Sequence, residues 1–277
     1  MIINCSSWQY VLPKRFLSYL VGKLARCRIV WLKNLLIDLF IKKYAISMHD
    51  AVEQNPHNYP YLESFFIRHF QPGARPFAAR NNTISSPADG KISQFGKIIE
   101  GCIIQAKGRK FSALELLGGM NDMAEDFVDG DFATIYLAPS NYHHVYMPID
   151  GTLHAMRHIP GKLFSVNNCT AKNVPNLFAR NERLVLVFQT SIGRVALILV
   201  GAMIVSSIYT SWANQDSQSI YLKRGEEVGY FTFGSTVIML LPKNAVNWNK
   251  KRMQKDQEIL TGQTIGTIIH RPDNSNN

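Results

Sequence analysis

Three polar residues on separate segments of the chain could together activate a serine hydroxyl. Ser235 lies between two apolar runs, His143 belongs to Tyr142-His-His-Val-Tyr-Met-Pro148, and Asp89 belongs to Ser86-Pro-Ala-Asp-Gly90. An imidazole that a carboxylate orients is the usual base for a nucleophilic serine. Each residue also has a purely structural interpretation, since small polar residues mark bulges and Pro-Ala-Asp-Gly is a turn sequence. The chemistry is therefore indicated only by the three segments together.

Other motifs accompany these segments in a fixed order. They are Phe65-Phe-Ile-Arg68 with Arg75-Pro76, Gln105-Ala-Lys-Gly108, Gly161-Lys-Leu-Phe-Ser-Val-Asn167, Asn176-Leu-Phe-Ala-Arg-Asn-Glu-Arg183, Val200-Gly-Ala202 and Gly234-Ser-Thr236. Any one of them could arise by chance, but the ordered set is highly specific. Through this set the chain resembles the phosphatidylserine decarboxylase family, in its bacterial form, over most of its length. Gln105, Lys107 and Ser165 lie in the matching motifs and are candidates for lining the site.

The resemblance implies a proenzyme that makes its own cofactor. The chain would cut itself between Gly234 and Ser235 into a large chain, 1–234, and a small chain, 235–277, and Ser235 would become a covalent pyruvoyl group that caps the small chain. This group would form a Schiff base with the amine of phosphatidylserine, and decarboxylation would yield phosphatidylethanolamine. The expected activity is that of a pyruvoyl-dependent carboxy-lyase of phospholipid biosynthesis.

Self-cleavage would begin with attack of Ser235 Oγ on the carbonyl carbon of Gly234, which turns an amide into an ester. β-Elimination then releases the glycine carboxylate and leaves dehydroalanine, which hydrolyses to pyruvoyl with loss of ammonia. Glycine suits position 234 because it lacks a Cβ, tolerates strained φ and ψ angles and lets a nucleophile approach. After decarboxylation a group must protonate the carbanion-like carbon. We assign this role to His143, because an imidazole both releases and accepts protons near neutral pH.

One position departs from the family pattern and leaves the base for self-cleavage open. Family members usually carry two histidines three residues apart in this segment, and the second would be the cleavage base, working with Asp89. This chain has Tyr146 there, and a tyrosine, with a reference pKa of about 10, is a poor base. His143 could serve in both steps, His144 could replace the missing histidine, or Tyr146 could orient a water molecule or the imidazole. We favour His143 in both steps.

Two other functions would use the same residues. A serine hydrolase would keep Ser235, His143 and Asp89 as a triad in an uncut chain, although the sequence has no Gly-x-Ser-x-Gly motif around Ser235. An inactive homologue would bind membranes through its N-terminal part, stay intact and turn over no substrate. Cutting of the chain distinguishes the decarboxylase from both.

The N-terminal part of the chain combines basic and apolar residues. The net charge is +10, and the first 45 residues carry eight basic side chains against one acidic side chain, Asp38. Apolar residues recur at helical spacing in Phe16/Leu20/Leu24, but no run of about 18 uncharged apolar residues could span a bilayer. A basic amphipathic region with a tryptophan indicates helices in the interface of an anionic membrane, over residues 1–57. The alternative is a helix packed on the core with a solvated basic edge. Nucleic acid is not expected as a partner.

The cysteines bear on the compartment and on metals. Cys5, Cys27, Cys102 and Cys169 are widely spaced and form no Cys-x-x-Cys pair, which argues against a zinc site and against a disulfide framework. We therefore expect no metal and four free thiols, as is typical of a reducing compartment. Together with the basic helices, this predicts a peripheral protein at the cytoplasmic face of the cell membrane.

The rest of the chain, residues 58–277, has the pattern of a β-rich catalytic domain. From about Ile84 onward, short apolar runs alternate with glycine. The runs 184–188 and 195–200 predict a hairpin, and Val237 to Leu241 predicts a buried strand just after the proposed cut. We expect an α+β fold with a mostly β core, barrel-like or sandwich-like, and amphipathic helices in front of it. A homodimer is one option for its assembly.

Overall fold

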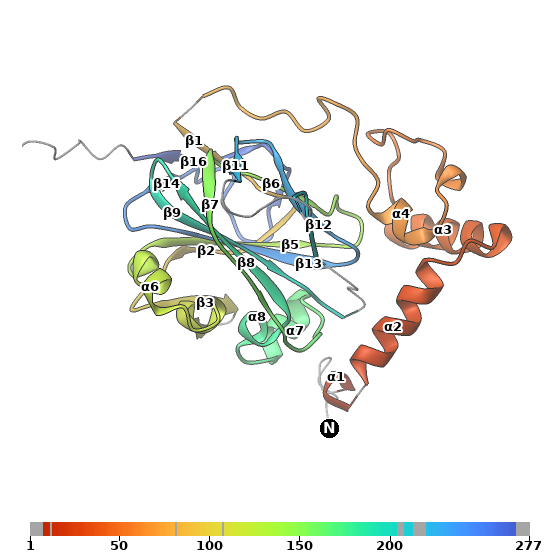
Figure 1. Ribbon diagram of the computed structural model, residues 1–277, viewed down its shortest axis with the longest axis horizontal. Coiled ribbons are helices and arrows are strands. Elements are labelled where there is room, and N and C mark those ends of the chain that lie inside the picture. Colours follow the sequence, from red (N-terminus) through yellow and green to blue (C-terminus); the bar gives the residue numbers. More distant parts are fainter. Residues whose placement is uncertain are drawn as a thin grey trace, which may run out of the picture.

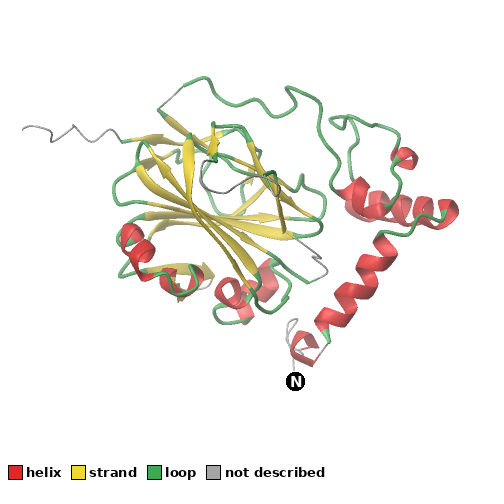
Figure 2. Ribbon diagram, in the orientation of Figure 1, coloured by secondary structure: helices red, strands yellow, loops and turns green. Residues whose placement is uncertain are grey.

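The computed structural model describes residues 8–11, 13–80, 82–106, 108–203, 208–212 and 220–269 (Figure 1). Its helices are α1 (Trp8–Val11), α2 (Lys14–Ala25), α3 (Val30–Tyr44), η1 (Pro56–Asn58), α4 (Leu62–Phe66), α5 (Ala113–Leu116), α6 (Asn121–Ala124), η2 (Glu125–Phe127), α7 (Asn168–Asn173) and α8 (Leu177–Arg180). Its strands are β1 (Thr83–Ser85), β2 (Gly90–Lys97), β3 (Cys102–Ala106), β4 (Arg109–Ser112), β5 (Asp131–Leu137), β6 (His144–Tyr146), β7 (Gly151–Ile159), β8 (Arg183–Thr190), β9 (Gly193–Val200), β10 (Ile208–Thr210), β11 (Tyr221–Leu222), β12 (Glu227–Phe231), β13 (Ser235–Leu241), β14 (Val246–Trp248), β15 (Glu258–Ile259) and β16 (Thr264–Ile268). The predicted α+β fold with a mostly β core is confirmed (Figure 2).

An eight-stranded sheet forms the centre of the molecule, in the order β11-β7-β8-β9-β13-β5-β2-β15. All neighbouring strands in it pair antiparallel. The predicted hairpin is present, because β8 pairs with β9 from Arg183↔Val200 to Thr190↔Gly193. β13 lies between β9 and β5, and all of its residues are buried. The unbroken apolar run from Val237 to Leu241 suits a strand whose two faces are both covered.

The two faces of this sheet contribute to separate apolar cores. Alternate side chains of a strand point to opposite faces. Ile238 and Leu240 therefore join the core shared with β4, α5 and α8. Val237, Met239 and Leu241 join the core shared with β1, β6, β12 and β14, which belong to two three-stranded sheets. The arrangement is sandwich-like. In the part of the chain that the structure describes, the large sheet is open, with β11 and β15 at its edges, and it does not close into a barrel.

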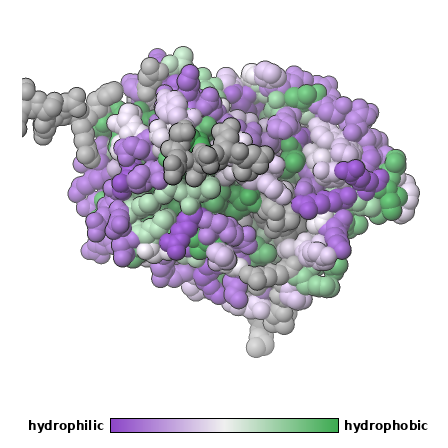
Figure 3. All heavy atoms as spheres, in the orientation of Figure 1, coloured by the Kyte–Doolittle hydropathy of each residue, from purple (hydrophilic) through white to green (hydrophobic). Residues whose placement is uncertain are grey.

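The helices α2 and α3 lie at one end of the molecule (Figure 1). Ile37 of α3 packs with Ile46 and Phe65 in a small core of its own, and Arg26 Nε donates to Glu63 Oε2 over 2.9 Å. Much of the remaining apolar surface of both helices is exposed, at Phe16, Tyr19, Leu20 and Leu24 of α2 and at Val30, Trp31, Leu35 and Leu39 of α3. Figure 3 shows apolar residues at this end of the molecule. None of the helices in the described ranges has the length and apolar character needed to span a bilayer.

The prediction that the cysteines are free thiols holds for some of them and not for others. Cys27 and Cys102 are free thiols, but Cys169 is disulfide-bonded, so the prediction of free thiols is wrong for Cys169. Wide spacing in a sequence does not keep two thiols apart in space, because a disulfide depends only on the distance between the two residues in the fold. Cys5 lies outside the described residues. Because Cys169 is disulfide-bonded, the thiols do not support the predicted cytoplasmic face.

Candidate active site

Ser235 is the first residue of β13 and is fully buried. Its partner in β5 is Leu137, and the chain reaches it from β12 through the bend at residues 232–234. The φ angle of Gly234 lies outside the left-handed region, and a Cβ added there would meet open space. In this conformation, position 234 does not use the access of glycine to the left-handed region. What glycine provides here is unhindered access to its own carbonyl group.

His143 contacts Ser235 directly. The Nδ1 atom of His143 lies 3.3 Å from Ser235 Oγ, and its Nε2 atom lies 3.0 Å from the carbonyl oxygen of Ala138. A carbonyl oxygen only accepts hydrogen bonds, so Nε2 carries the ring proton and Nδ1 is left to accept from the serine hydroxyl. Burial lowers the pKa of His143 to about 3. The imidazole is therefore neutral at physiological pH, with its Nδ1 lone pair facing the hydroxyl.

Local structure holds this imidazole in place. Residues 138–141 form a turn in which Asn141 N donates to Ala138 O over 2.9 Å and Asn141 Oδ1 accepts from Ala138 N over 2.8 Å. This turn aims the Ala138 carbonyl at His143. On the other side, the ring of Phe66 from α4 packs on the imidazole with a centroid distance of 4.3 Å. The conformation of the imidazole is thus fixed by both hydrogen bonding and packing.

Asp89 is buried but binds a different partner. Its two carboxylate oxygens share a bifurcated hydrogen bond from Arg75 Nε, 3.0 Å to each, and the carboxylate also accepts from Arg75 Nη2 over 2.7 Å and from Thr261 N over 2.8 Å. The residue that accepts from His143 is Ala138 instead. The structure therefore brings Ser235 and His143 together without joining Asp89 to them in a hydrogen-bonded triad.

Tyr146 makes no hydrogen bond to Ser235 in the part of the chain that the structure describes. Its hydroxyl is 3.1 Å from the hydroxyl of Tyr142. Burial raises the pKa of Tyr146, and the negative charges of Glu227 and Asp89 act in the same direction. The phenol therefore keeps its proton at neutral pH, and it is unsuited to removing a proton from serine.

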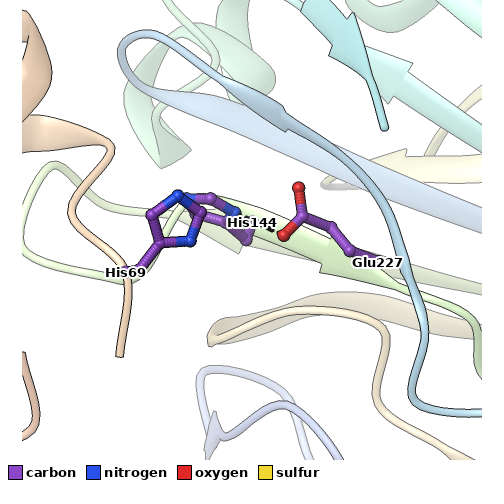
Figure 4. A group of neighbouring side chains, drawn as sticks. All are labelled: His69, His144 and Glu227. Atoms are coloured by element: carbon purple, nitrogen blue, oxygen red, sulfur yellow. Dashed lines mark hydrogen bonds and ion pairs between the residues drawn. The ribbon is translucent and has the colours of Figure 1, made fainter. Parts of the chain in front are cut away.

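His144 points away from the serine. Its Nδ1 atom lies 3.0 Å from Glu227 Oε2, and its Nε2 atom lies 3.1 Å from the carbonyl oxygen of Ile67. Figure 4 shows the ring turned towards Glu227. Both ring nitrogens are thus engaged outside the Ser235 site. This geometry gives no support to His144 as a replacement for the missing histidine.

Comparison with known proteins identifies the family. The model of the family described as phosphatidylserine decarboxylase matches residues 62–267, and a second model, described as PSD, matches residues 7–45. A protein of Photobacterium profundum is 48% identical over 277 residues, covering 94% of this chain and 95% of the relative. One from Idiomarina loihiensis is 46% identical over 259 residues, covering 87% and 89%. Both relatives are called phosphatidylserine decarboxylase proenzyme. The chain belongs to the phosphatidylserine decarboxylase family. The predicted recognition of this family, and of a carboxy-lyase, is confirmed.

An apolar cavity of about 270 Å³ adjoins the proposed cut. Gly234 and Phe233 line it from the bend before β13, and Leu24 and Phe40 line it from α2 and α3. Ser165, a motif residue named above, lines it as well. In this family member the N-terminal helices therefore form one wall of a hollow that reaches the Gly234 backbone.

Other motif residues differ in their placement. Gln105 Nε2 donates to the carbonyl oxygens of Ala171 and Val174, each over 2.8 Å, and its Oε1 accepts from Leu177 N. Gln105 therefore holds the segment from α7 to α8 in place, and the expectation that it lines the site is not supported. Lys107 lies outside the described residues.

Arg68 ends the Phe65-Phe-Ile-Arg68 motif, and the sequence alone predicted no role for it. Arg68 is 3% exposed, and its Nε and Nη1 atoms have no hydrogen-bond partner in the described part of the chain. The guanidinium lies over the rings of Phe65 and Phe70, 5.4 and 5.6 Å from their centroids. Burial is the main cause of the lowered pKa of His143, and the hydrogen bond to Ala138 opposes it. Arg68 is close enough for its positive charge to lower the pKa of that imidazole further. An arginine inside an otherwise apolar motif was the available signal.

Proposed function

We propose that the chain is a proenzyme that cuts itself between Gly234 and Ser235 and, once cut, decarboxylates phosphatidylserine to phosphatidylethanolamine. The contact between Ser235 Oγ and His143 Nδ1, 3.3 Å long, carries the proposal. Nδ1 is free to take the hydroxyl proton while Oγ attacks the Gly234 carbonyl carbon, so His143 serves as the cleavage base. Family membership and the names of the relatives support the same reaction.

A pyruvoyl group formed from Ser235 would be the cofactor of the cut protein. When present, it supplies an electron sink for decarboxylation, as pyridoxal phosphate does in other enzymes. The surroundings of Ser235 suit such a group: Phe66 packs on His143 and on Phe233, with centroid distances of 4.3 and 4.7 Å, and shields the position from water. In the cut protein Nδ1 of His143 is the atom placed to take up a proton and pass it on there.

Arg68 suits an anionic substrate. Phosphatidylserine carries a phosphate and a carboxylate, and a buried guanidinium without a partner is costly unless an anion neutralises it. Burial lowers the pKa of Arg68, which reflects this cost. We therefore assign to Arg68 the binding of an anionic group of the phospholipid headgroup, beside His143.

The exposed apolar faces of α2 and α3 support attachment to a membrane surface. Phe16 and Trp31 are 61% and 68% exposed, and basic residues such as Lys23 and Lys43 lie on the same helices. Apolar side chains that enter the interface and basic side chains that meet anionic lipid act together in such helices. The protein would be peripheral, and the region 1–57 would bring the catalytic domain, 58–277, to its lipid substrate.

The uncut serine hydrolase has less support. A stable triad needs a carboxylate on the imidazole, but Asp89 is held by Arg75 and His143 donates to Ala138 O. Ser235 is fully buried. An intramolecular attack on the adjacent Gly234 carbonyl is compatible with that burial.

The test is an intact mass measurement on freshly purified protein. The proposal expects two chains split after Gly234, with the small chain lighter by one ammonia than a chain that begins with serine. Ser235→Ala should remain a single uncut chain, and His143→Ala should cut about 10²–10⁴-fold more slowly. Ser191→Ala, at an exposed serine in the β8–β9 turn, is the matched control and should cut normally. A single full-length wild-type species, or two chains from Ser235→Ala, would contradict the proposal.

A further inference from the structure

Two imidazoles and a carboxylate meet outside the Ser235 site. One donor atom each from His69, His144 and Glu227 lies within 4.8 Å of the others. His69 follows α4, His144 begins β6 and Glu227 begins β12, so the group joins three elements that are far apart in the sequence (Figure 4). Two histidines with one glutamate form an established donor set for zinc sites that keep a position open for water or another ligand.

The hydrogen bonds of His144 leave its Nδ1 atom available to bind a metal ion. Its Nε2 atom faces the carbonyl oxygen of Ile67 at 3.1 Å and so carries the ring proton, while Nδ1 faces Glu227 Oε2 at 3.0 Å. Metal-binding histidines almost always donate their second ring N–H to a carbonyl or carboxylate in this way. A lone pair and a carboxylate oxygen this close require a positive charge between them, which a proton or a metal ion can provide.

The distances between the three side chains indicate which of them would have to move to coordinate an ion. Donor atoms in a tetrahedral zinc site with bonds of about 2.1 Å lie roughly 3.4 Å apart. The His144–Glu227 pair is already at 3.0 Å, and His144 is buried against the ring of Tyr142, with a centroid distance of 4.5 Å. His69 is exposed, so its side chain is free to close the remaining distance, and its open side gives an ion a path of entry.

We propose that His69, His144 and Glu227 bind one divalent ion of the zinc class. The bound ion would join the segment after α4 to β6 and β12. The backbone of this segment is already anchored, because Val52 N donates to His69 O over 2.9 Å. The ion would therefore stabilise the position of α4, whose Phe66 packs on His143. The cysteine spacing that predicted no metal had no bearing on this site, because its three ligands are two histidines and a glutamate.

The test is titration of the tag-free, chelator-treated protein with Zn²⁺ by calorimetry and with Co²⁺ by visible absorption. All three ligands precede Gly234, so they remain on one chain whether or not the protein cuts itself, and the result is independent of the proposed activity. One equivalent of Zn²⁺ should bind and raise the Tm. Mg²⁺ should not compete, because it prefers oxygen ligands.

Two variants distinguish this site from adventitious binding. His69→Ala should fold normally, since the side chain is exposed, and should weaken Zn²⁺ binding by at least about tenfold. His158→Ala is the matched control, because His158 Nε2 lies 3.1 Å from Glu182 Oε1 in an exposed histidine–glutamate pair, and it should leave binding unchanged. Absence of stoichiometric binding, or equal loss in both variants, would show that a proton alone bridges His144 and Glu227 and would overturn the proposal.

Discussion

The carboxylate of Asp89 is held by the guanidinium of Arg75, with Asp89 Oδ2 2.7 Å from Arg75 Nη2. The Asp89 side chain is 3% exposed and that of Arg75 is 15% exposed, so this is an ion pair largely shielded from solvent. Among the described residues Asp89 makes no hydrogen bond to Ser235 or His143, and it fixes instead the segment at Arg75 and the backbone at Thr261. We propose that its contribution to chain cutting is one of positioning.

Replacing Arg75 and replacing Asp89 should affect stability and chain cutting differently. Arg75→Ala leaves a buried carboxylate without its partner and should lower the free energy of unfolding by about 3–5 kcal/mol. Asp89→Asn keeps the shape and should slow chain cutting with a smaller loss of stability. Urea denaturation and time-resolved intact mass measure the two effects. Lys91→Ala, which breaks an exposed pair with Glu258, is the control. Unchanged cutting in Asp89→Asn would remove Asp89 from the maturation machinery.

The buried imidazole of His143 should make stability depend on pH. Burial lowers its pKa from 6.5 to about 3, so between these values the unfolded chain binds a proton that the folded protein does not. The free energy of unfolding should therefore fall as the pH drops from 6.5 towards 3, by up to about 1.4 kcal/mol per pH unit from this residue. Urea denaturation of uncut Ser235→Ala protein, with and without His143→Gln, isolates the contribution. Equal slopes in the two proteins would contradict it.

Replacing Arg68 should lower the activity without lowering the stability of the protein. Arg68→Met removes a buried charge without a hydrogen-bond partner in the described structure and keeps an unbranched side chain, so the variant should be at least as stable. If Arg68 binds the phospholipid headgroup, kcat/KM for phosphatidylserine should fall by about tenfold or more. Thermal denaturation and steady-state kinetics measure the two quantities. The exposed Arg157 provides the control, Arg157→Met, and equal activity in both variants would exclude headgroup binding by Arg68.

The exposed apolar face of the N-terminal helices should determine membrane binding. Phe16→Ser with Trp31→Ser removes two side chains that are exposed on α2 and α3. Burial of each in a bilayer interface is worth about 1.5–3 kcal/mol, so partitioning into anionic vesicles should fall by at least about tenfold. Ile99→Ser changes an exposed apolar residue of the catalytic domain, outside the region 1–57, and should have no effect. Unaltered vesicle binding of the double variant would instead favour a helix packed on the core.

Local patterns in the sequence were sufficient to predict several elements of the fold. The hairpin of β8 and β9, the buried strand β13 and the exposed stripe of Phe16, Leu20 and Leu24 follow from apolar spacing and turn residues, which act within a few positions of the chain. The ordered motifs were likewise sufficient for the family, because their order is a property of the sequence itself.

The partner of each polar side chain was decided only by the tertiary structure. The sequence placed a hydroxyl, an imidazole and a carboxylate in three motifs, but only packing joined His143 to Ser235, Asp89 to Arg75 and His144 to Glu227. A hydrogen bond depends on distances of about 3 Å and on direction, and residues far apart along the chain acquire these only when the sheets pack. The protonation of His143 follows from the same contacts, because burial and the Ala138 carbonyl together leave Nδ1 free.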